Sequence, residues 1–384
     1  MSGPSTVSDQ EAPRVADTAL VVAPGSSAGA VPAAAGTAPA AAAADVVASP
    51  RRRGRRIGTG RAIAVLAACT LALLAIVAAS LVFGVRSIDP GVVWQAIVGP
   101  DPANADHNVV WQLRVPRTVI GLLAGVALGL AGTLIQGVTR NPIADPGLLG
   151  LNAGASLAVV LCIAMLGVSS PLGYIWFAFG GAAAAAAIVF SIGRGQPVRL
   201  ALVGAAVTAF ITPLIALVLL RDTETFNQYR FWAVGSLTGR GLDVAALLWP
   251  FILVGAIVAF VLANRLNLLA LGDDVANSLG QRVGTTRLAA GIGLVLLCGT
   301  ATSLAGPIAL VGLVVPHAAR RLVGTDYRWI MPTALLLGPV MLLAADVIGR
   351  LIVPNAELEA GVVAAFLGAP VLIAIARSRN VAGL

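Results

Sequence analysis

The chain has 384 residues, of which 58% are hydrophobic and only 11% are charged, and its mean hydropathy is +0.92. Because soluble domains are about half apolar and a quarter charged, this composition excludes an ordinary soluble globular protein. The net charge of +8 comes from arginine alone, since the sequence contains no lysine. A phosphate-binding loop of the Walker A type needs a lysine, so an ATPase of that kind would have to be a separate polypeptide.

The N-terminal segment, residues 1–56, is rich in alanine, proline, serine and glycine and shows no apolar periodicity. This composition predicts a disordered tail, which ends in the basic cluster RRRGRR at 51–56. The apolar run that follows is too long for the core of a typical signal peptide and lacks a clear small-residue cleavage site. We therefore interpret it as a retained first span, and predict a cytoplasmic tail, 1–56, followed by a transmembrane domain, 57–384.

Apolar runs then recur with short breaks as far as the C-terminus, and a helix that crosses a bilayer needs about 20 such residues. We predict an all-α polytopic membrane protein with about ten transmembrane helices. The predicted spans are 62–84, 117–138, 148–167, 174–192, 200–220, 242–263, 288–305, 309–322, 330–351 and 361–376. On the second span, Gly121, Gly125 and Gly129 recur every four residues, which predicts close packing of that helix face against a neighbour.

Charge predicts the orientation of these spans. With a cytoplasmic N-terminus, ten spans place 18 of the 25 arginines inside and 7 outside, so the positive-inside rule favours both termini in the cytoplasm. Two long segments, 85–116 and 221–241, are then outside. The longest inner loop after the tail, 264–287, alternates leucine and valine with polar residues. It predicts two short helices and a docking surface for a soluble partner, with a simple interfacial connector as the alternative.

The segment between the second and third spans reads RNPIADPGLLG, residues 140–150. Pro142 disfavours α geometry at Asn141, and Pro146 does the same at Asp145, so no helix continues through this segment. Irregular backbone at membrane depth is tolerated only where it lines a water-filled cavity or is buried in protein. We predict a kinked hairpin that lines a cavity; a plain tight turn is the alternative.

Five regions together resemble a known family, in the same order along residues 110–377. They read VWQLRVPRT (110–118), QGVTRNPIADPGLLG (136–150), LALGDDVANSLG (269–280), GPIALVGLVVPHAARRLVG (306–324), and LLAADVIGRL with AELEAGVVAAFLGAP (342–351 and 356–370). They are similar to the FecCD-type permease subunits of ATP-driven importers for iron-siderophores, haem and vitamin B12. The tail lies outside the resemblance.

The resemblance implies a vitamin B12 importer permease-like fold in the cell membrane of a bacterium. It implies a second permease, identical or paralogous, and two ATPase subunits that bind ATP and magnesium. It also implies an extracytoplasmic substrate-binding lipoprotein. It implies no cofactor or metal held by this chain and no nucleic-acid partner.

The resemblance also assigns roles to arginines at outer helix ends, which in the family meet glutamates of the binding protein. Guanidinium groups suit bidentate pairing with carboxylates, and interfacial arginines that snorkel are the alternative. The implied docking residues are Arg114, Arg117 and Arg350. Asp346 lies one helical turn before Arg350, so their spacing predicts an ion pair within one helix.

At the cytoplasmic side, the family's hairpin closes the pathway together with the loop before the fifth span. At that loop the vitamin B12 permease has small hydroxyl residues, so Pro197 and Val198 here argue against vitamin B12 as the substrate. The implied gate residues are Asn141, Pro142, Ile143, Pro197 and Val198. The implied ATPase-coupling residues are Leu271, Gly272, Asp273, Asp274, Ala276, Leu279 and Gly280.

Other polar residues have simpler interpretations. His317 follows Pro316, and we expect its ring nitrogens to bond the backbone groups that the proline frees. Asp273 and Asp274 suit the start of a short helix, where carboxylates interact favourably with the helix dipole. The three cysteines lie apart within apolar runs and are expected to be packing residues.

The predicted function is the permease of an ABC importer, with iron(III)-siderophore as substrate and the pathway at a permease dimer interface. The chain itself is predicted not to be an enzyme. One alternative is a ten-span secondary transporter, a class that usually needs an intramembrane carboxylate; Asp346 comes closest but lies near the outer end. A membrane-embedded enzyme is the other alternative, and the chain lacks an evident paired acidic or nucleophilic constellation for it.

Overall fold

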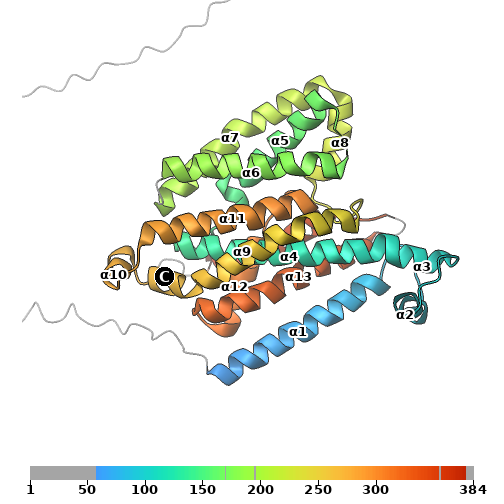
Figure 1. Cartoon of the computed structure of the whole chain (residues 1–384), viewed down its shortest axis with the longest axis horizontal. Helices are drawn as coiled ribbons and strands as arrows, with labels where there is room; N and C mark the ends of the chain where they lie inside the picture. Colours follow the sequence, from blue (N-terminus) through green and yellow to red (C-terminus); the bar gives the residue numbers. More distant parts are fainter. Residues whose placement is uncertain (1–57, 169, 194–195, 354–355, 378–384) are drawn as a thin grey trace, which may run out of the picture. The chain divides into compact units, whose positions relative to one another are not determined.

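The computed structural model describes residues 58–168, 170–193, 196–353 and 356–377 (Figure 1). The predicted tail, 1–56, lies outside the described residues. Within these ranges all regular secondary structure is helical, as expected for an all-α protein. The helices are α1 (Thr59–Val82), α2 (Pro90–Val98), α3 (Ala105–Val109), the π-helical η1 (Val110–Arg114), α4 (Val115–Thr139), the 3-10 helix η2 (Pro146–Leu149), α5 (Leu151–Leu166), α6 (Pro171–Gly193), α7 (Pro197–Arg221), α8 (Thr223–Ala233), α9 (Leu242–Leu269), α10 (Asp273–Ser278), α11 (Val283–Ala305), α12 (Val311–Val323), α13 (Tyr327–Ile352) and α14 (Ala360–Arg377).

Each of the ten predicted spans falls on one of these helices. Among the described residues, seven helices are long and apolar enough to cross a membrane, and α3, η1 and α4 join into the longest of them, Ala105–Thr139. α5 and α14 are shorter apolar helices, and α12 has 13 residues. The chain is therefore a multi-pass membrane protein.

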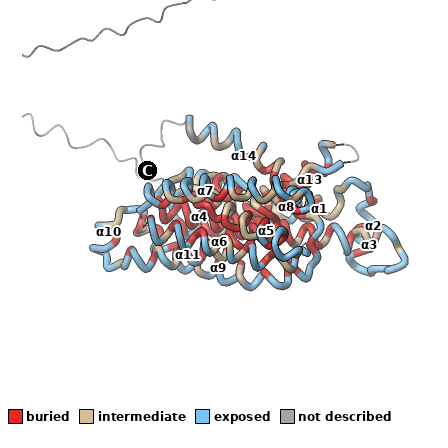
Figure 2. Tube along the Cα trace, turned by 90° about the horizontal axis from the view of Figure 1, so that it is seen from above, coloured by how far each residue is buried: buried red, intermediate tan, exposed pale blue. Residues whose placement is uncertain are grey.

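α4 is the central helix of the bundle. Its most apolar stretch is 78% buried, whereas those of α1 and α7 are only 11% buried, and Figure 2 shows buried residues concentrated along α4. The glycines explain how a neighbour approaches so closely. A Cβ atom added to Gly125 would lie 2.4 Å from the Cα of Pro339 in α13, and one added to Gly129 would lie 2.6 Å from the carbonyl oxygen of Ala334. The predicted small-residue packing face is thus confirmed.

The two ends of the bundle carry different short elements. α2, α3 and α8 lie at one end and α10 lies at the opposite end (Figure 1). The segments 85–116 and 221–241 therefore share an end, and 264–287 lies at the other, as the charge-based topology requires.

The prediction of two short helices in 264–287 is wrong. α9 continues as far as Leu269 and α11 already begins at Val283, which leaves α10 as the one separate helix of the segment. The reason is burial: Leu266 and Leu269 are fully buried and extend the packed face of α9. The chain turns only at Gly272, where φ is +113°, a conformation that favours glycine.

Candidate functional site

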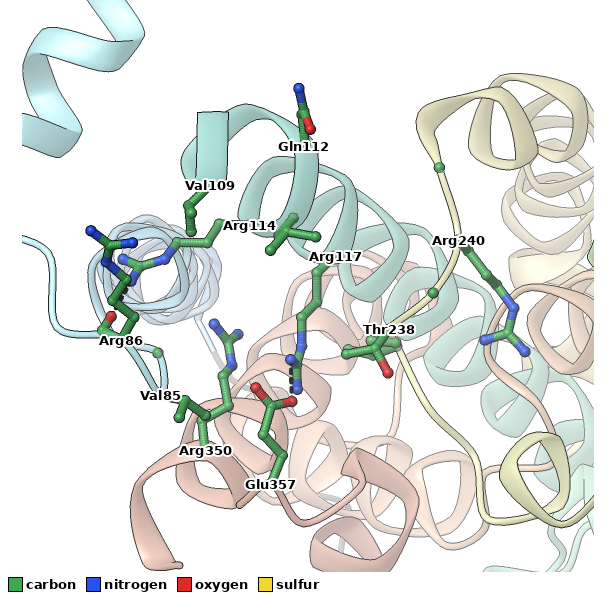
Figure 3. Close-up of a pocket in the computed structure, with 15 residues that line it drawn as sticks. Val85, Arg86, Val109, Gln112, Arg114, Arg117, Thr238, Arg240, Arg350 and Glu357 are labelled. Atoms are coloured by element: carbon green, nitrogen blue, oxygen red, sulfur yellow. Dashed lines mark hydrogen bonds and ion pairs between the residues drawn. The ribbon is translucent and has the colours of Figure 1, made fainter. Parts of the chain in front are cut away.

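A cavity of about 550 Å³ opens at the end of the bundle that carries α2 and α3 (Figure 3). Its walls come from the segment after α1, from η1 and α4, from 237–241, and from Arg350 and Glu357. The three arginines that the resemblance implies for docking, Arg114, Arg117 and Arg350, all line it. Residues far apart in the sequence are thus brought to one place.

Arg114 closes the end of α1. Its Nη1 donates to the carbonyl oxygens of Leu81 and Val82, at 2.7 Å each, and its Nη2 donates to that of Arg86 at 2.5 Å. The last carbonyls of a helix have no partner within the helix, and a cation at that end is also favoured by the helix dipole. Arg114 therefore fixes the C-terminal end of α1 to the start of α4.

Arg117 is held by two carboxylates. Its Nε and Nη2 donate to Asp346 at 2.7–3.1 Å, in a bidentate arrangement, and its Nη1 donates to Glu357 at 2.6 Å. Asp346 is fully buried, whereas the Glu357 side chain is 35% exposed. Figure 3 shows the Arg117–Glu357 contact at the cavity wall.

Arg350 completes the network. It forms an ion pair with Asp346 one turn earlier in α13, as the helical spacing predicts. Its Nη1 donates to the carbonyl oxygens of Ser80 and Phe83 at 2.9 and 2.8 Å, and its Nη2 donates to the Ser80 hydroxyl at 2.9 Å. Buried charges need such partners, because an unpaired buried charge is strongly destabilising.

The three arginines are therefore not free side chains that project outwards. They are only 5%, 8% and 4% exposed in chain order, and each is already engaged within the chain. Sequence reasoning missed Ser80 and Glu357. Glu357 lies in one of the quoted motifs, but it is 240 residues from Arg117, and no local spacing rule pairs them.

Two further arginines line the cavity. Arg86 pairs with Asp106 at 2.7 Å and its side chain is 61% exposed. Arg240 points away from the other labelled arginines (Figure 3), and its Nη1 donates to the carbonyl oxygen of Ser236 at 2.6 Å. Burial lowers the pKa of the Arg240 guanidinium, and Tyr174 and Glu359 partly oppose that shift. Arg86 is thus the accessible cation of this cavity.

The kinked hairpin lies at the other end of α4. The helix ends at Thr139, and Arg140 takes a left-handed conformation with φ of +50°. The Asn141 side-chain oxygen accepts from the Ile143 backbone N–H at 3.0 Å, and the Asp145 carboxylate accepts from that of Gly147 at 2.8 Å. The predicted interruption of the helix is confirmed.

Gln136 anchors this hairpin to α12. Its Nε2 donates to the carbonyl oxygens of Ala144 and Leu313, both at 3.2 Å, and its Oε1 accepts from Arg320 at 2.6 Å. One side chain thereby joins α4, the hairpin and α12. The side of the hairpin that faces α7 lines a groove.

A groove of about 540 Å³ lies between the hairpin and α7. Asn141 and Ile143 border it on one side, and Ala201, Ala205 and Thr208 border it on the other. The part of α7 opposite the hairpin is thus its second to fourth turns. Pro197 is the first residue of α7, and Val198, 72% exposed, lies about one turn before the groove.

The segment 264–287, named the coupling segment below after the role that the resemblance implies, presents an apolar face around α10. Leu271, Val275 and Leu279 recur every four residues and are 61%, 45% and 59% exposed, whereas Ala276 is fully buried. Left-handed glycines bound the segment, Gly272 before α10 and Gly280 after it.

Asp273 and Asp274 lie in the first turn of α10, as predicted. Asp273 also forms ion pairs with Arg140 and Arg287. Among the described residues, no group of three metal-ligating side chains is arranged to hold a metal. The Nε2 of His317 is buried without a hydrogen-bond partner in the described structure, so the predicted bond to freed backbone is not found for that nitrogen.

Comparison with known proteins adds the evolutionary relation. The FecCD transport family model matches residues 71–378. The chain is 46% identical to the ferric enterobactin transport system permease protein FepD of Escherichia coli (strain K12), across 85% of this chain and 98% of that protein. It is 37% identical to a probable siderophore transport system permease, YfiZ of Bacillus subtilis (strain 168), across 82% of this chain and 95% of that protein.

A solved structure is similar over almost the same length. It shows an inward-facing conformation of a metal-chelate type ABC transporter, with a TM-score of 0.72 and 26% identity, and covers 82% of this chain and 99% of that chain. The family match extends over most of the transmembrane bundle and includes the arginine cavity, the hairpin and the coupling segment. The chain therefore belongs to the FecCD transport family.

Proposed function

We propose that this chain is the membrane-spanning permease of an ABC importer for ferric siderophores in a bacterial cell membrane. The observation that carries the proposal is the near full-length similarity to a ferric enterobactin permease, on a chain whose helices form a membrane bundle. Ferric enterobactin, or a chelate of the same class, is the proposed substrate.

The proposed topology has ten spans with both termini in the cytoplasm. To the seven long apolar helices it adds α5, α12 and α14, which are short for a full crossing. α5 and α12 each follow an irregular segment: η2 and the left-handed Gly150 precede α5, and the left-handed Leu310 precedes α12. Broken helices of this kind are tolerated where backbone lines a cavity or is buried in protein.

The proposed assembly contains a second permease, two ATPase subunits and an extracytoplasmic binding lipoprotein. ATP and magnesium bind to the ATPase subunits, since this chain has no lysine for a Walker A loop. The exposed leucines at 271 and 279 and the left-handed turns at Gly272 and Gly280 give the ATPase an apolar docking face. Asp273, Asp274 and Ala276 build the short helix between those turns.

The proposed gate is formed by Asn141, Pro142 and Ile143 with the start of α7, Pro197 and Val198 included. Its support is the groove that the hairpin and α7 share, because a pathway at a permease dimer interface needs such a wall. Rotation of α7 towards the hairpin would narrow this groove.

Docking of the binding protein is proposed at the outer cavity. Arg114, Arg117 and Arg350 build its positive wall, and Arg86 is its most exposed cation. The buried carboxylate of Asp346 is bonded to both Arg117 and Arg350. This arrangement favours a structural role for Asp346 over the ion-coupling carboxylate that a secondary transporter requires.

The test is uptake into proteoliposomes that contain this permease with its ATPase, its binding protein and any paralogous permease. Radiolabelled ferric enterobactin should accumulate only when ATP is supplied on the side of the membrane that carries the ATPase subunits. It should also require the binding protein. The purified chain alone should hydrolyse no ATP. Accumulation driven by an ion gradient without ATP would overturn the proposal.

A further inference from the structure

Arg140 connects the gate hairpin to the coupling segment. Its Nη2 donates to the Asp273 carboxylate at 2.7 Å, and Arg287 Nη2 lies 3.0 Å from the other oxygen of the same carboxylate. Arg140 directly precedes Asn141, Asp273 is the first residue of α10, and Arg287 lies in the first turns of α11. One carboxylate thus ties together the end of α4, α10 and α11.

The backbone is unusual at Arg140 and at Gly272, the residue before Asp273. Arg140 and Leu310 are the two non-glycine residues with positive φ among the described residues. Glycine or asparagine usually takes this position after a helix, because other side chains are strained there. Arginine is thus an unusual residue at this site, and its side chain is engaged by Asp273. Opposite it, Gly272 has φ of +113°, and a Cβ added there would lie 3.9 Å from Arg140 Nη1.

The space around the ion pair is open. A cavity of about 260 Å³ separates the hairpin from the coupling segment, with Pro142 and Arg140 on one wall and Leu271 and Gly272 on another. The Arg140 side chain therefore bridges two elements that the cavity holds apart. On its other side the hairpin is anchored to α12 through Gln136.

We infer that Arg140 is a positioning residue that transmits movement of the coupling segment to the cytoplasmic gate. When α10 moves with an ATPase subunit, the Asp273 carboxylate carries the Arg140 guanidinium with it, and the strained backbone at Arg140 turns the hairpin that begins at Asn141. Arg287 keeps the carboxylate oriented during the movement. This inference rests on the proposed importer function.

The exposure of the pair fits this role. The side chains of Arg140 and Asp273 are 33% and 36% exposed, and ion pairs in such surroundings stabilise a fold little. The pair can therefore shift with the coupling segment without unfolding the bundle. The role of the Arg140–Asp273 pair is therefore to position the hairpin, not to stabilise the fold.

The experiment compares wild type with Arg140→Gln in the complete importer, reconstituted in proteoliposomes with ferric enterobactin as the probe. Uptake per ATP hydrolysed should fall by about fivefold or more, the lower end of the usual range of coupling between sites. Release of entrapped ferric enterobactin without ATP should rise. Arg140→Lys, which keeps the charge, should restore part of both.

The matched control is Arg328→Gln, outside the coupling segment at the start of α13, since Arg328 is exposed, follows Tyr327 of the same cavity wall and forms no ion pair among the described residues. This variant should keep the wild-type ratio of uptake to ATP hydrolysis and the wild-type rate of release without ATP. An Arg140→Gln importer with an unchanged ratio and unchanged leak would overturn the inference. If that variant does not reach the membrane, Asp273→Asn removes the same ion pair and takes its place under the same criterion.

A double-mutant cycle separates the ion pair from two independent defects. If Arg140 acts through Asp273, the double variant Arg140→Gln/Asp273→Asn should lose no more coupling than the worse single variant. Additive losses would contradict the inference. A wild-type assembly that takes up no ferric enterobactin would instead count against the proposed function, so the two failures are distinguishable.

Discussion

Both ends of α4, which the proposed topology places at the outer and the cytoplasmic side, carry an arginine–aspartate network, but the two networks are built differently. At the outer end, Asp346 is fully buried and Arg117 and Arg350 are less than a tenth exposed. At the other end, Arg140 and Asp273 are about a third exposed, and Arg140 lines an open cavity. The first network joins helices that pack directly, and the second joins the end of α4 to α10 and α11.

The difference shows how burial decides what an ion pair does. In the outer network every change of position would leave a charge without a partner away from water, which is strongly unfavourable. In the cytoplasmic network water can replace a lost partner, so movement costs little. We therefore interpret the Asp346 network as a fixed point, meaning a rigid contact between packed helices, and the Asp273 network as a contact that can move. The following predictions test that contrast.

The largest effect is expected for Asp346→Asn. It leaves Arg117 and Arg350 without their shared counter-charge, and removing one partner of a buried pair typically costs about 3–5 kcal/mol. Thermal unfolding in detergent should show a large loss of stability. The control Asp243→Asn, at the exposed start of α9, should cost about 1 kcal/mol or less. Equal melting of the two variants would refute the fixed-point interpretation.

A second large effect, again on stability, is expected for Gly125→Val. This variant tests whether the rigid contact between α4 and α13 continues along α4 to Gly125. The new side chain would overlap Pro339 in α13, and overpacking of this kind typically costs about 1–3 kcal/mol. Gly180→Val in α6 is the matched control, because a Cβ there meets nothing within 4 Å. If both variants unfold at the same temperature, the close approach of α4 and α13 does not stabilise the bundle.

A smaller effect is expected for Glu357→Gln on docking. Glu357 accepts a hydrogen bond from Arg117 Nη1, in the place that a carboxylate of the binding protein could take. Neutralising Glu357 should therefore leave Arg117 Nη1 available to the binding protein. Exposed ion pairs are worth up to about 1 kcal/mol, and tenfold in affinity is 1.4 kcal/mol, so affinity for the binding protein in nanodiscs should rise by up to about fivefold. The gain should shrink at high salt.

The control for docking is Glu224→Gln on α8, at the same end of the bundle, which should leave the affinity unchanged. Weaker docking of the Glu357→Gln variant would mean that Glu357 supports the interface. Charge reversal at Arg114 or Arg350 does not test docking alone, because both side chains also bond backbone carbonyl groups at the end of α1. Such variants are expected to lose stability as well as docking.

The smallest effect is expected for Arg140→Gln on the stability of the isolated chain. An ion pair that is a third exposed contributes at most about 1 kcal/mol. The melting temperature should therefore change far less than in Asp346→Asn, although the same substitution should uncouple the importer. A loss as large as that of Asp346→Asn would show that the cytoplasmic network is a fixed point too.

Local patterns in the sequence predict the local parts of this structure. The ten apolar runs all become helices, Pro142 ends α4 where expected, and the four-residue spacing of Asp346 and Arg350 becomes an ion pair. Each of these depends on backbone geometry within a few residues. The family resemblance adds which regions belong together.

Tertiary partners could not be predicted in the same way. Arg117 and Asp346 are 229 residues apart, and the carbonyl groups that Arg114 bonds lie on another helix. Such pairs exist only once α1, α4 and α13 have packed. The error at 264–287 has the same origin, because burial of Leu266 and Leu269 against other helices extends α9 beyond the point that composition indicates.

The closing of the end of α1 has a consequence for biogenesis. α1 is mostly exposed along its length. Two of the groups that hold its C-terminal end, the guanidinium of Arg350 and that of Arg114, belong to α13 and to η1. A chain synthesised from its N-terminus inserts α1 long before Arg350 is made. We therefore expect the carbonyl groups of Ser80 and Phe83 to be hydrated until α13 has been made, and the final position of α1 to depend on the arrival of α13.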